Sequence, residues 1–428
     1  MKIKFNTKQR IIYETLKLSS KQRARAYREQ FRPPTPLRSR PLDNLKSLRD
    51  GPVIVAGFMS SSIGLGVAAR KLVASLRSVQ IEPRVHDLSA AFEQPQMHSD
   101  WCKSIGECPE GGTVILCMNP LEIPHALNKL PARILEGRWL IGYFWWELEQ
   151  IPLEWLSTVR QFDEVWVSSG FVYSAFSSHV HDFELSLLPI SIDVDGPEPK
   201  RRTGREFVVL SACDLNSWPQ RKNPEGAVQA FVKAFGRDPN ARLIIKIQNA
   251  HDLDKRLPSI ARIAADHGNV ELIAENFSEE RFKRLLERTD VILSLHRSEG
   301  LGLIPLEGMA AGKVVVATNW GGSCDYLDAA SGIPIGYKLR PIAEGEYVHV
   351  PPGSRWAEPD IDEAASWLRI LRDDPDLCLR LGTEARHRVA FQYGLDSKRH
   401  IIKDLVSRHR QNRQVANARP LTDAIGDG

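Results

Sequence analysis

The chain has 428 residues, of which 42% are hydrophobic, enough for roughly two or three domains with cores of their own. Its six cysteines are scattered without the spacing of a zinc site or a redox motif, which favours a reducing compartment. No run of about 18 apolar residues occurs, and the N-terminus carries charges where a signal peptide needs an apolar core. We therefore expect a cytoplasmic protein without membrane spans or structural disulfides.

The positive charge is concentrated at the start of the chain. Residues 1–50 hold 6 Lys and 8 Arg against 2 Glu and 2 Asp, so the remainder of the chain is net negative. The pattern predicts a basic helical arm followed by a proline-rich linker. Two interpretations stay open: a solvated arm, or attraction of residues 1–32 to anionic lipid at the inner face of the membrane. Nucleic acid is not expected as a partner, because nothing downstream supplies a basic groove interleaved with aromatic residues.

From Gly51 onward, short β-rich runs alternate with helical stretches, which predicts an α/β fold with parallel sheets. Strands are expected at residues 53–56, 114–117, 139–143, 164–168, 207–212, 242–247, 270–273, 291–295 and 314–318. These are too many for one compact sheet. We expect a first domain over 51–192, a linker rich in Pro, Gly and charge over 193–205, and a second domain over 206–395.

The stretch HRSEGLGLIPLEGMAAG, residues 296–312, places two glutamates around a glycine-rich turn. A buried strand precedes it, Gly300 and Gly302 permit a tight turn, and a helix follows with Gly312 at its C-terminal end. The helix N-terminus offers free N–H groups and partial positive charge, which stabilise an anion such as a diphosphate. Glu299 and Glu307 would flank that anion and accept hydrogen bonds from sugar or ribose hydroxyls.

The longer stretch SEGLGLIPLEGMAAGKVVVATNWGG resembles the E-x7-E signature of the family 4 retaining glycosyltransferases. DLNSWPQRKNPEGAVQAFVKAF at 214–235 is similar to the family's lysine-containing loop, and DEVWVSS at 163–169 and WAEPD at 356–360 resemble a bacterial surface-polysaccharide branch. The resemblance extends from Gly51 to about residue 395. It implies a GT-B fold, in which two Rossmann-like domains face each other across the donor site. A helix at 396–415 would cross back to the first domain, leaving a tail at 416–428.

The resemblance also implies roles for particular residues. Glu299 would contact the donor sugar, Glu307 the nucleotide ribose, and Lys222 the phosphate. Ser217 stands where family members commonly carry an arginine, and we expect the adjacent Arg221 to compensate. The remaining donor-side candidates are the turn residues Gly300, Leu301, Gly302 and Leu303, together with His296.

In the first domain, GFMSSSIGLGVAAR at 57–70 contains Gly64 and Gly66 in a G-x-G-x-x-A pattern, and Asp87 follows. A dinucleotide fingerprint turns directly after its strand, whereas here residues 58–63 intervene. This argues for a loop that closes over donor phosphate or acceptor, and against an NAD site.

The stretch IGYFWWELEQIP, residues 141–152, stands where many family members carry a catalytic histidine. Trp145 and Trp146 are read equally well as core residues or as a platform for a sugar face. On the second reading, Glu147 orients an acceptor hydroxyl. The three residues are our acceptor-side candidates.

No cofactor or metal is expected. Asp193 and Asp195 imitate a metal-binding D-x-D pattern but fall in the proposed linker, and His179 and His181 have no further ligands nearby in sequence. The function predicted is transfer of a sugar from a nucleoside diphosphate sugar to a hydroxyl of a glycan or lipid-linked acceptor. Two alternatives stay open: an inactive nucleotide-sugar-binding regulatory protein and, more remotely, an NAD-dependent oxidoreductase.

Overall fold

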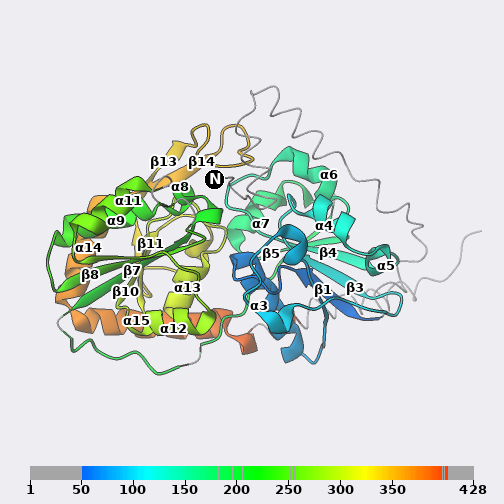
Figure 1. Ribbon diagram of the computed structural model, residues 1–428, viewed down its shortest axis with the longest axis horizontal. Coiled ribbons are helices and arrows are strands. Elements are labelled where there is room, and N and C mark those ends of the chain that lie inside the picture. The colour runs from blue at the N-terminus through cyan, green and yellow to red at the C-terminus, as the bar shows by residue number, and fades with distance from the viewer. Residues whose placement is uncertain are drawn as a thin grey trace, which may run out of the picture.

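A computed structural model describes residues 51–402, except 181–182, 195, 205, 251–252, 254–256, 398 and 400. The predicted basic arm, the C-terminal tail and most of the predicted crossing helix therefore lie outside the described residues. Within them, two six-stranded parallel sheets form two lobes that lie side by side (Figure 1). The expectation of more than one sheet is confirmed.

The first sheet has the strand order β2-β1-β3-β4-β5-β6. Its strands are β1 (Val53–Gly57), β2 (Arg84–Asp87), β3 (Thr113–Cys117), β4 (Trp139–Phe144), β5 (Glu164–Val167) and β6 (Glu184–Leu187). Its helices are α3 (Gly64–Ser78), α4 (Ile123–Lys129), α5 (Ala132–Leu135), α6 (Leu156–Val159) and α7 (Gly170–Ser177). Residues alternate between the two faces, as a pleated strand requires. Val55 packs with α3 on the face toward the second lobe, and Ile54 packs with α4, α5 and α7 on the other.

The second sheet has the order β12-β11-β10-β7-β8-β9. Its strands are β7 (Phe207–Asp214), β8 (Ala241–Gln248), β9 (Val270–Ile273), β10 (Val291–Ser294), β11 (Val314–Thr318) and β12 (Ile333–Ile335). Its helices are α8 (Pro219–Lys222), α9 (Pro224–Phe235), α11 (Pro258–Asp266), α12 (Glu279–Glu287), α13 (Leu303–Ala310), α14 (Ile361–Asp373) and α15 (Pro375–Tyr393). Val208 and Leu210 face α12, α13 and α15, whereas Phe207 and Val209 face α9 and α14.

Every strand predicted from the sequence is present, with small shifts at the ends. The strands that were missed include β2, β6 and β12. These lie at sheet edges, where one side of the strand stays open, so they lack the continuous apolar run that marks a central strand.

Two features join the lobes. One apolar cluster contains Val55 and Leu72 of the first lobe together with Leu306 and Val389 of the second. A hairpin of β13 (Tyr337–Pro341) and β14 (Arg355–Pro359) also extends from the second lobe toward the first (Figure 1). Its connecting loop packs on the first lobe's other core. The two domains therefore meet over apolar surface on both sides of the cleft.

No helix among the described residues combines the length and apolar character needed to cross a membrane.

Candidate functional site

The turn between β10 and α13 holds its peptide groups in one orientation. The Ser169 hydroxyl, from the first domain, donates to the carbonyl of Gly300. The Tyr326 hydroxyl lies 3.0 Å from the carbonyl oxygen of Leu301 and 2.7 Å from that of Gly302. Because a trans peptide points its C=O and the next N–H in opposite directions, the N–H groups of residues 301–303 face away from these anchors. None of those three N–H groups has a hydrogen-bond acceptor among the described residues.

Glycine is required at both ends of this turn. Gly302 has φ +84°, and a Cβ there would lie 2.7 Å from the Tyr326 hydroxyl. A Cβ on Gly300 would lie 2.4 Å from the carbonyl oxygen of Trp146 in the first domain. The missing side chains therefore allow both the turn and the close approach of the two domains.

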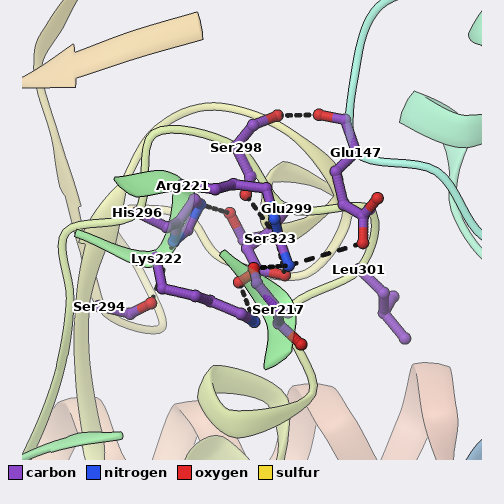
Figure 2. Close-up of polar contacts among 12 residues, drawn as sticks. Glu147, Ser217, Arg221, Lys222, Ser294, His296, Ser298, Glu299, Leu301 and Ser323 are labelled. Carbon is purple, nitrogen blue, oxygen red and sulfur yellow. Dashed lines mark hydrogen bonds and ion pairs between the residues drawn. The ribbon is translucent and has the colours of Figure 1, made fainter. Parts of the chain in front are cut away.

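Glu299 is paired with two cations directly before the turn. Its Oε1 accepts a hydrogen bond from Lys222 Nζ, and its Oε2 lies 3.1 Å from Arg221 Nη1. Burial alone raises the pKa of this carboxyl, but the two nearby cations outweigh burial and lower the pKa to about 2. Glu299 is therefore ionised at neutral pH. Figure 2 shows the three side chains converging.

The short helix α8 carries both cations and is tied to the β10 loop. Asn223, at φ +51°, ends α8 and caps α9 by accepting from the N–H of Gly226, while its Nδ2 donates to the carbonyl of Leu295 at 2.8 Å. The carbonyl of Arg221 accepts from the N–H of Arg297 at 2.8 Å. These bonds place Arg221 and Lys222 beside Glu299 although the residues are far apart in sequence.

Glu147 brings a carboxylate from the first domain to the same cations. Its Oε1 lies 3.6 Å from Arg221 Nη2, and its Oε2 accepts from the Tyr347 hydroxyl at 2.8 Å. Its backbone carbonyl accepts from the Ser298 hydroxyl (Figure 2). Arg221 therefore lies between the carboxylate of Glu147 in the first domain and that of Glu299 in the second. Tyr347, in the loop of the hairpin, holds the Glu147 carboxylate in place.

Two cavities meet at this point. The smaller, of about 170 Å³, is lined by Glu299, Glu147, Trp145 and the turn residues 300–303. The larger, of about 770 Å³, extends along α12 and α13 past Glu307. Gly64, Asp214, Ser217, Lys222 and Leu303 line both cavities. The arrangement suits an elongated ligand with one end at Glu299 and its body beside Glu307.

Glu307 differs electrostatically from Glu299. It lines the larger cavity in the second turn of α13, and its carboxylate forms no ion pair or hydrogen bond within the described part of the chain. Burial raises its pKa to about 7, although Lys71 opposes the shift. At neutral pH, Glu299 before the turn is therefore fully ionised, whereas Glu307 after it is close to its pKa.

The glycine-rich loop of the first domain covers the cleft from the opposite side. Arg70 donates to the carbonyls of Met59 and Ser61 at 2.8 and 2.7 Å and reaches Glu279 of the second domain at 2.7 Å. Asp87 accepts from the N–H and hydroxyl groups of both Ser60 and Ser89. Because Asp87 fixes the loop and lines neither cavity, it does not serve as the ribose-binding acid of a dinucleotide site.

Three predicted site residues line neither cavity. His296 is fully buried, with Nδ1 3.0 Å from the Ser294 hydroxyl and Nε2 3.0 Å from the carbonyl of Trp320, and burial lowers its pKa. Trp146 packs against Trp155 in the core. Gly66 allows the carbonyls of residues 58 and 61 to approach the helix. These residues shape the site, and direct contact with a ligand stays a prediction for them.

Trp145, by contrast, does line the smaller cavity. Its buried Nε1 has no hydrogen-bond acceptor among the described residues, and its backbone N–H donates to Asn119 Oδ1 at 3.0 Å. Of the two adjacent tryptophans, it alone offers a free donor to a ligand there.

Sequence reasoning missed Tyr347, Arg70 and Asn223. Tyr347 lies in a loop with no motif, and its contact with Glu147 spans 200 residues. Arg70 appeared only as the last letter of the glycine-rich stretch. Asn223 carried a usable signal, because Asn before Pro224 is a common N-terminal cap of a helix.

The metal look-alikes named from the sequence lie only partly within the described residues. Asp193 lies 3.6 Å from Lys71 Nζ, while Asp195 and His181 are outside the described residues. Among the residues that are described, no group of three or more His, Cys, Asp or Glu could hold a metal ion.

Comparison with known proteins identifies the architecture. Anabaena HepE, solved with UDP and glucose, superposes with a TM-score of 0.60 over 84% of this chain and all of that one, at 13% sequence identity. The fold is GT-B. In this GT-B fold, residues 202–338 match the family model described as "Glycosyl transferases group 1". The matched part contains Lys222, Glu299 and Glu307.

Two curated proteins show sequence similarity. Human alpha-1,3/1,6-mannosyltransferase ALG2 is 26% identical over 212 residues, covering 42% of this chain and 48% of that one. A Corynebacterium glutamicum GDP-mannose-dependent phosphatidylinositol monomannoside mannosyltransferase is 24% identical over 237 residues, covering 51% and 54%. The chain thus spans about half the length of the curated relatives it matches.

Proposed function

We propose that this protein is a retaining glycosyltransferase that uses a nucleoside diphosphate sugar. The observation that carries the proposal is the turn after β10, whose N–H groups at 301–303 have no acceptor among the described residues while their carbonyls are anchored on the far side. Buried N–H groups normally have partners, so an anionic ligand is their natural complement. The match to a glycosyltransferase family model over the same residues supports this reading.

The donor would lie across both cavities. Its diphosphate would accept hydrogen bonds from the turn and from Lys222, and its ribose hydroxyls would donate to Glu307 in the larger cavity. The transferred sugar would occupy the smaller cavity beside Glu299. That carboxylate stays ionised, because Lys222 and Arg221 hold its pKa at about 2, and so can accept from two sugar hydroxyls.

In the transfer step, the bond between the anomeric carbon and the phosphate oxygen breaks as the acceptor oxygen attacks from the same face. The acceptor proton passes to the departing phosphate oxygen. Lys222, Arg221 and the α13 N-terminus stabilise the negative charge that develops on the leaving group, a role that preorganised cations and N–H groups perform well. The same groups support our expectation that a divalent metal is not required.

Glu147 is proposed to orient the acceptor hydroxyl. Tyr347 and Arg221 hold its carboxylate at the wall of the smaller cavity, where Trp145 presents a free indole N–H. The name of the Corynebacterium glutamicum relative gives a phosphatidylinositol monomannoside as its acceptor, whereas the name of the human relative gives only mannosyl transfer. We extend only the class of acceptor to this protein: a hydroxyl of a glycan or lipid-linked sugar.

The test is release of nucleoside diphosphate from a panel of UDP-, GDP-, ADP- and dTDP-sugars, with and without a simple sugar acceptor. At least one donor should be consumed, and Glu299→Gln should abolish turnover while Glu384→Gln, an exposed glutamate of α15, should not. Binding without turnover would favour a regulatory protein. Tight binding of NAD(H) alone would favour the oxidoreductase, which the contacts of Asp87 disfavour. Retention is read from the anomeric configuration of the product by NMR.

Attraction of residues 1–32 to an anionic membrane, and with it a position at the inner face, stays a prediction. Deleting these residues should reduce sedimentation with anionic liposomes. Unchanged sedimentation would contradict it.

A further inference from the structure

A buried lysine in the larger cavity has no part in the mechanism above. Lys246 lies near the end of β8, and the residue is 2% exposed. Its Nζ donates to Gln248 Oε1 and lies 5.2 Å from the ring centre of Phe277. Among the described residues, Lys246 forms no ion pair with a carboxylate, and Gln248 is its hydrogen-bond partner. Lys246, Gln248 and Phe277 all line the larger cavity.

An isolated buried ammonium is costly, so its presence calls for a compensating partner. Of its three N–H donors, one is occupied by Gln248. Asp214 is the acid that acts electrostatically on Lys246, and its Oδ1 already accepts from the N–H of Asn216 and the amide of Asn249. Burial lowers the lysine's pKa to about 8, with Asp214 opposing the shift. Two donors therefore stay available to a ligand in the cavity.

The position of Lys246 in the sheet indicates which part of a nucleotide it would meet. The phosphate-binding turn follows β10, and β7 lies between β10 and β8 in the sheet. Two strand spacings therefore separate β8 from β10, a distance of about 10 Å. Residues two apart on a strand share a face, so Lys246 and Gln248 present an ammonium and an amide side by side. The Lys246 ammonium can donate a hydrogen bond, and the Gln248 amide beside it can donate or accept one. This pair matches a flat heterocycle that has a carbonyl next to a ring N–H. Phe277 forms an apolar wall beside the pair.

We propose that Lys246 and Gln248 form a nucleobase subsite for a base that presents a carbonyl beside a ring N–H, the edge shared by uracil, thymine and guanine. This inference rests on the proposed function. The ammonium donates to the carbonyl oxygen, and Gln248 Oε1 turns to accept from the ring N–H. Cytosine and adenine carry an amino group at the position of that carbonyl. Because the amino group and the Lys246 ammonium are both hydrogen-bond donors, they cannot bond to each other.

The experiment is calorimetric titration of the full-length protein with UDP, GDP, CDP, ADP and inorganic pyrophosphate. The wild type should bind UDP or GDP at least about tenfold more tightly than CDP or ADP. Lys246→Met, which keeps the shape and removes the charge, should weaken that best ligand about tenfold to a hundredfold, the range for a charged hydrogen bond. Pyrophosphate binding should not change. Lys233→Met, on the exposed face of α9, is the matched control and should bind as the wild type does.

Several outcomes would overturn the inference. Equal losses for UDP and pyrophosphate would make Lys246 a phosphate ligand, and unchanged affinities would make it a structural lysine. Replacing a buried charge by an apolar group is often neutral or stabilising, so the variant is expected to fold. Should it not fold, Gln248→Leu tests the same subsite and should reduce the preference for the keto bases. If the wild type binds no nucleotide at all, the proposed function fails as well, whereas normal binding by Lys246→Met removes only this inference.

Discussion

Donor affinity is expected to depend on pH through Glu307. The pKa of its carboxyl is raised to about 7 by burial, so roughly one tenth of the molecules carry the ionised form at about pH 6 and nine tenths at about pH 8. If the ionised form binds the ribose hydroxyls, donor affinity should rise by up to tenfold over this interval. That change corresponds to about 1.4 kcal/mol. A protonated carboxyl keeps some acceptor capacity, which makes tenfold the upper limit.

The assay is titration with an intact nucleotide sugar, whose diphosphate is esterified on both sides and does not titrate in this range. Wild type is compared with Glu307→Gln and with the exposed control Glu384→Gln. Lys71, Glu279, Lys283 and Asp193 also influence Glu307, and they are unchanged in the variants, so their contribution cancels. Glu307→Gln should bind like the wild type near pH 6, bind more weakly near pH 8, and show a flat profile. Parallel pH profiles for wild type and Glu307→Gln would refute the reasoning.

Three further predictions concern the cluster at Glu299. Lys222→Met should reduce kcat by about a hundredfold or more, as loss of a charge-stabilising group does, and an unchanged kcat would remove Lys222 from the leaving-group site. Tyr347→Phe keeps the ring but removes the hydrogen bond to Glu147, so kcat should fall about tenfold with little change in donor KM. A change confined to donor KM would contradict a positioning role for Tyr347. Glu299→Gln should lower the free energy of unfolding by about 3 kcal/mol at neutral pH, since the native pKa of about 2 lies below an unfolded value of about 4.5. That stabilisation is present above the unfolded pKa and is lost as pH falls toward 2, so urea unfolding curves of the two proteins should converge in acid, and a constant difference would count against the linkage.

The central strands and the turn after β10 could be predicted because their signals are local. A buried apolar run followed by Gly-Leu-Gly dictates a strand and a tight turn within one short stretch. Glu299, Glu307 and Lys222 could be named for the same reason, since each lies in a motif.

Contacts made by tertiary proximity could not be predicted. Nothing in the residues around Tyr347 indicates that a hairpin carries it to Glu147. The two adjacent tryptophans show a similar limit, because composition does not say which one turns into the core and which toward the cavity. His296 has the residue type of a ligand contact, but its neighbours in sequence do not indicate that its side chain is fully buried.

The most direct test of the account is a crystal structure of the protein with an intact nucleotide sugar. We expect the diphosphate on the N–H groups of residues 301–303 and on Lys222, the ribose on Glu307, and the sugar beside Glu299 in the smaller cavity. A nucleotide held at the Gly64 loop alone, with its ribose away from Glu307, would contradict the account.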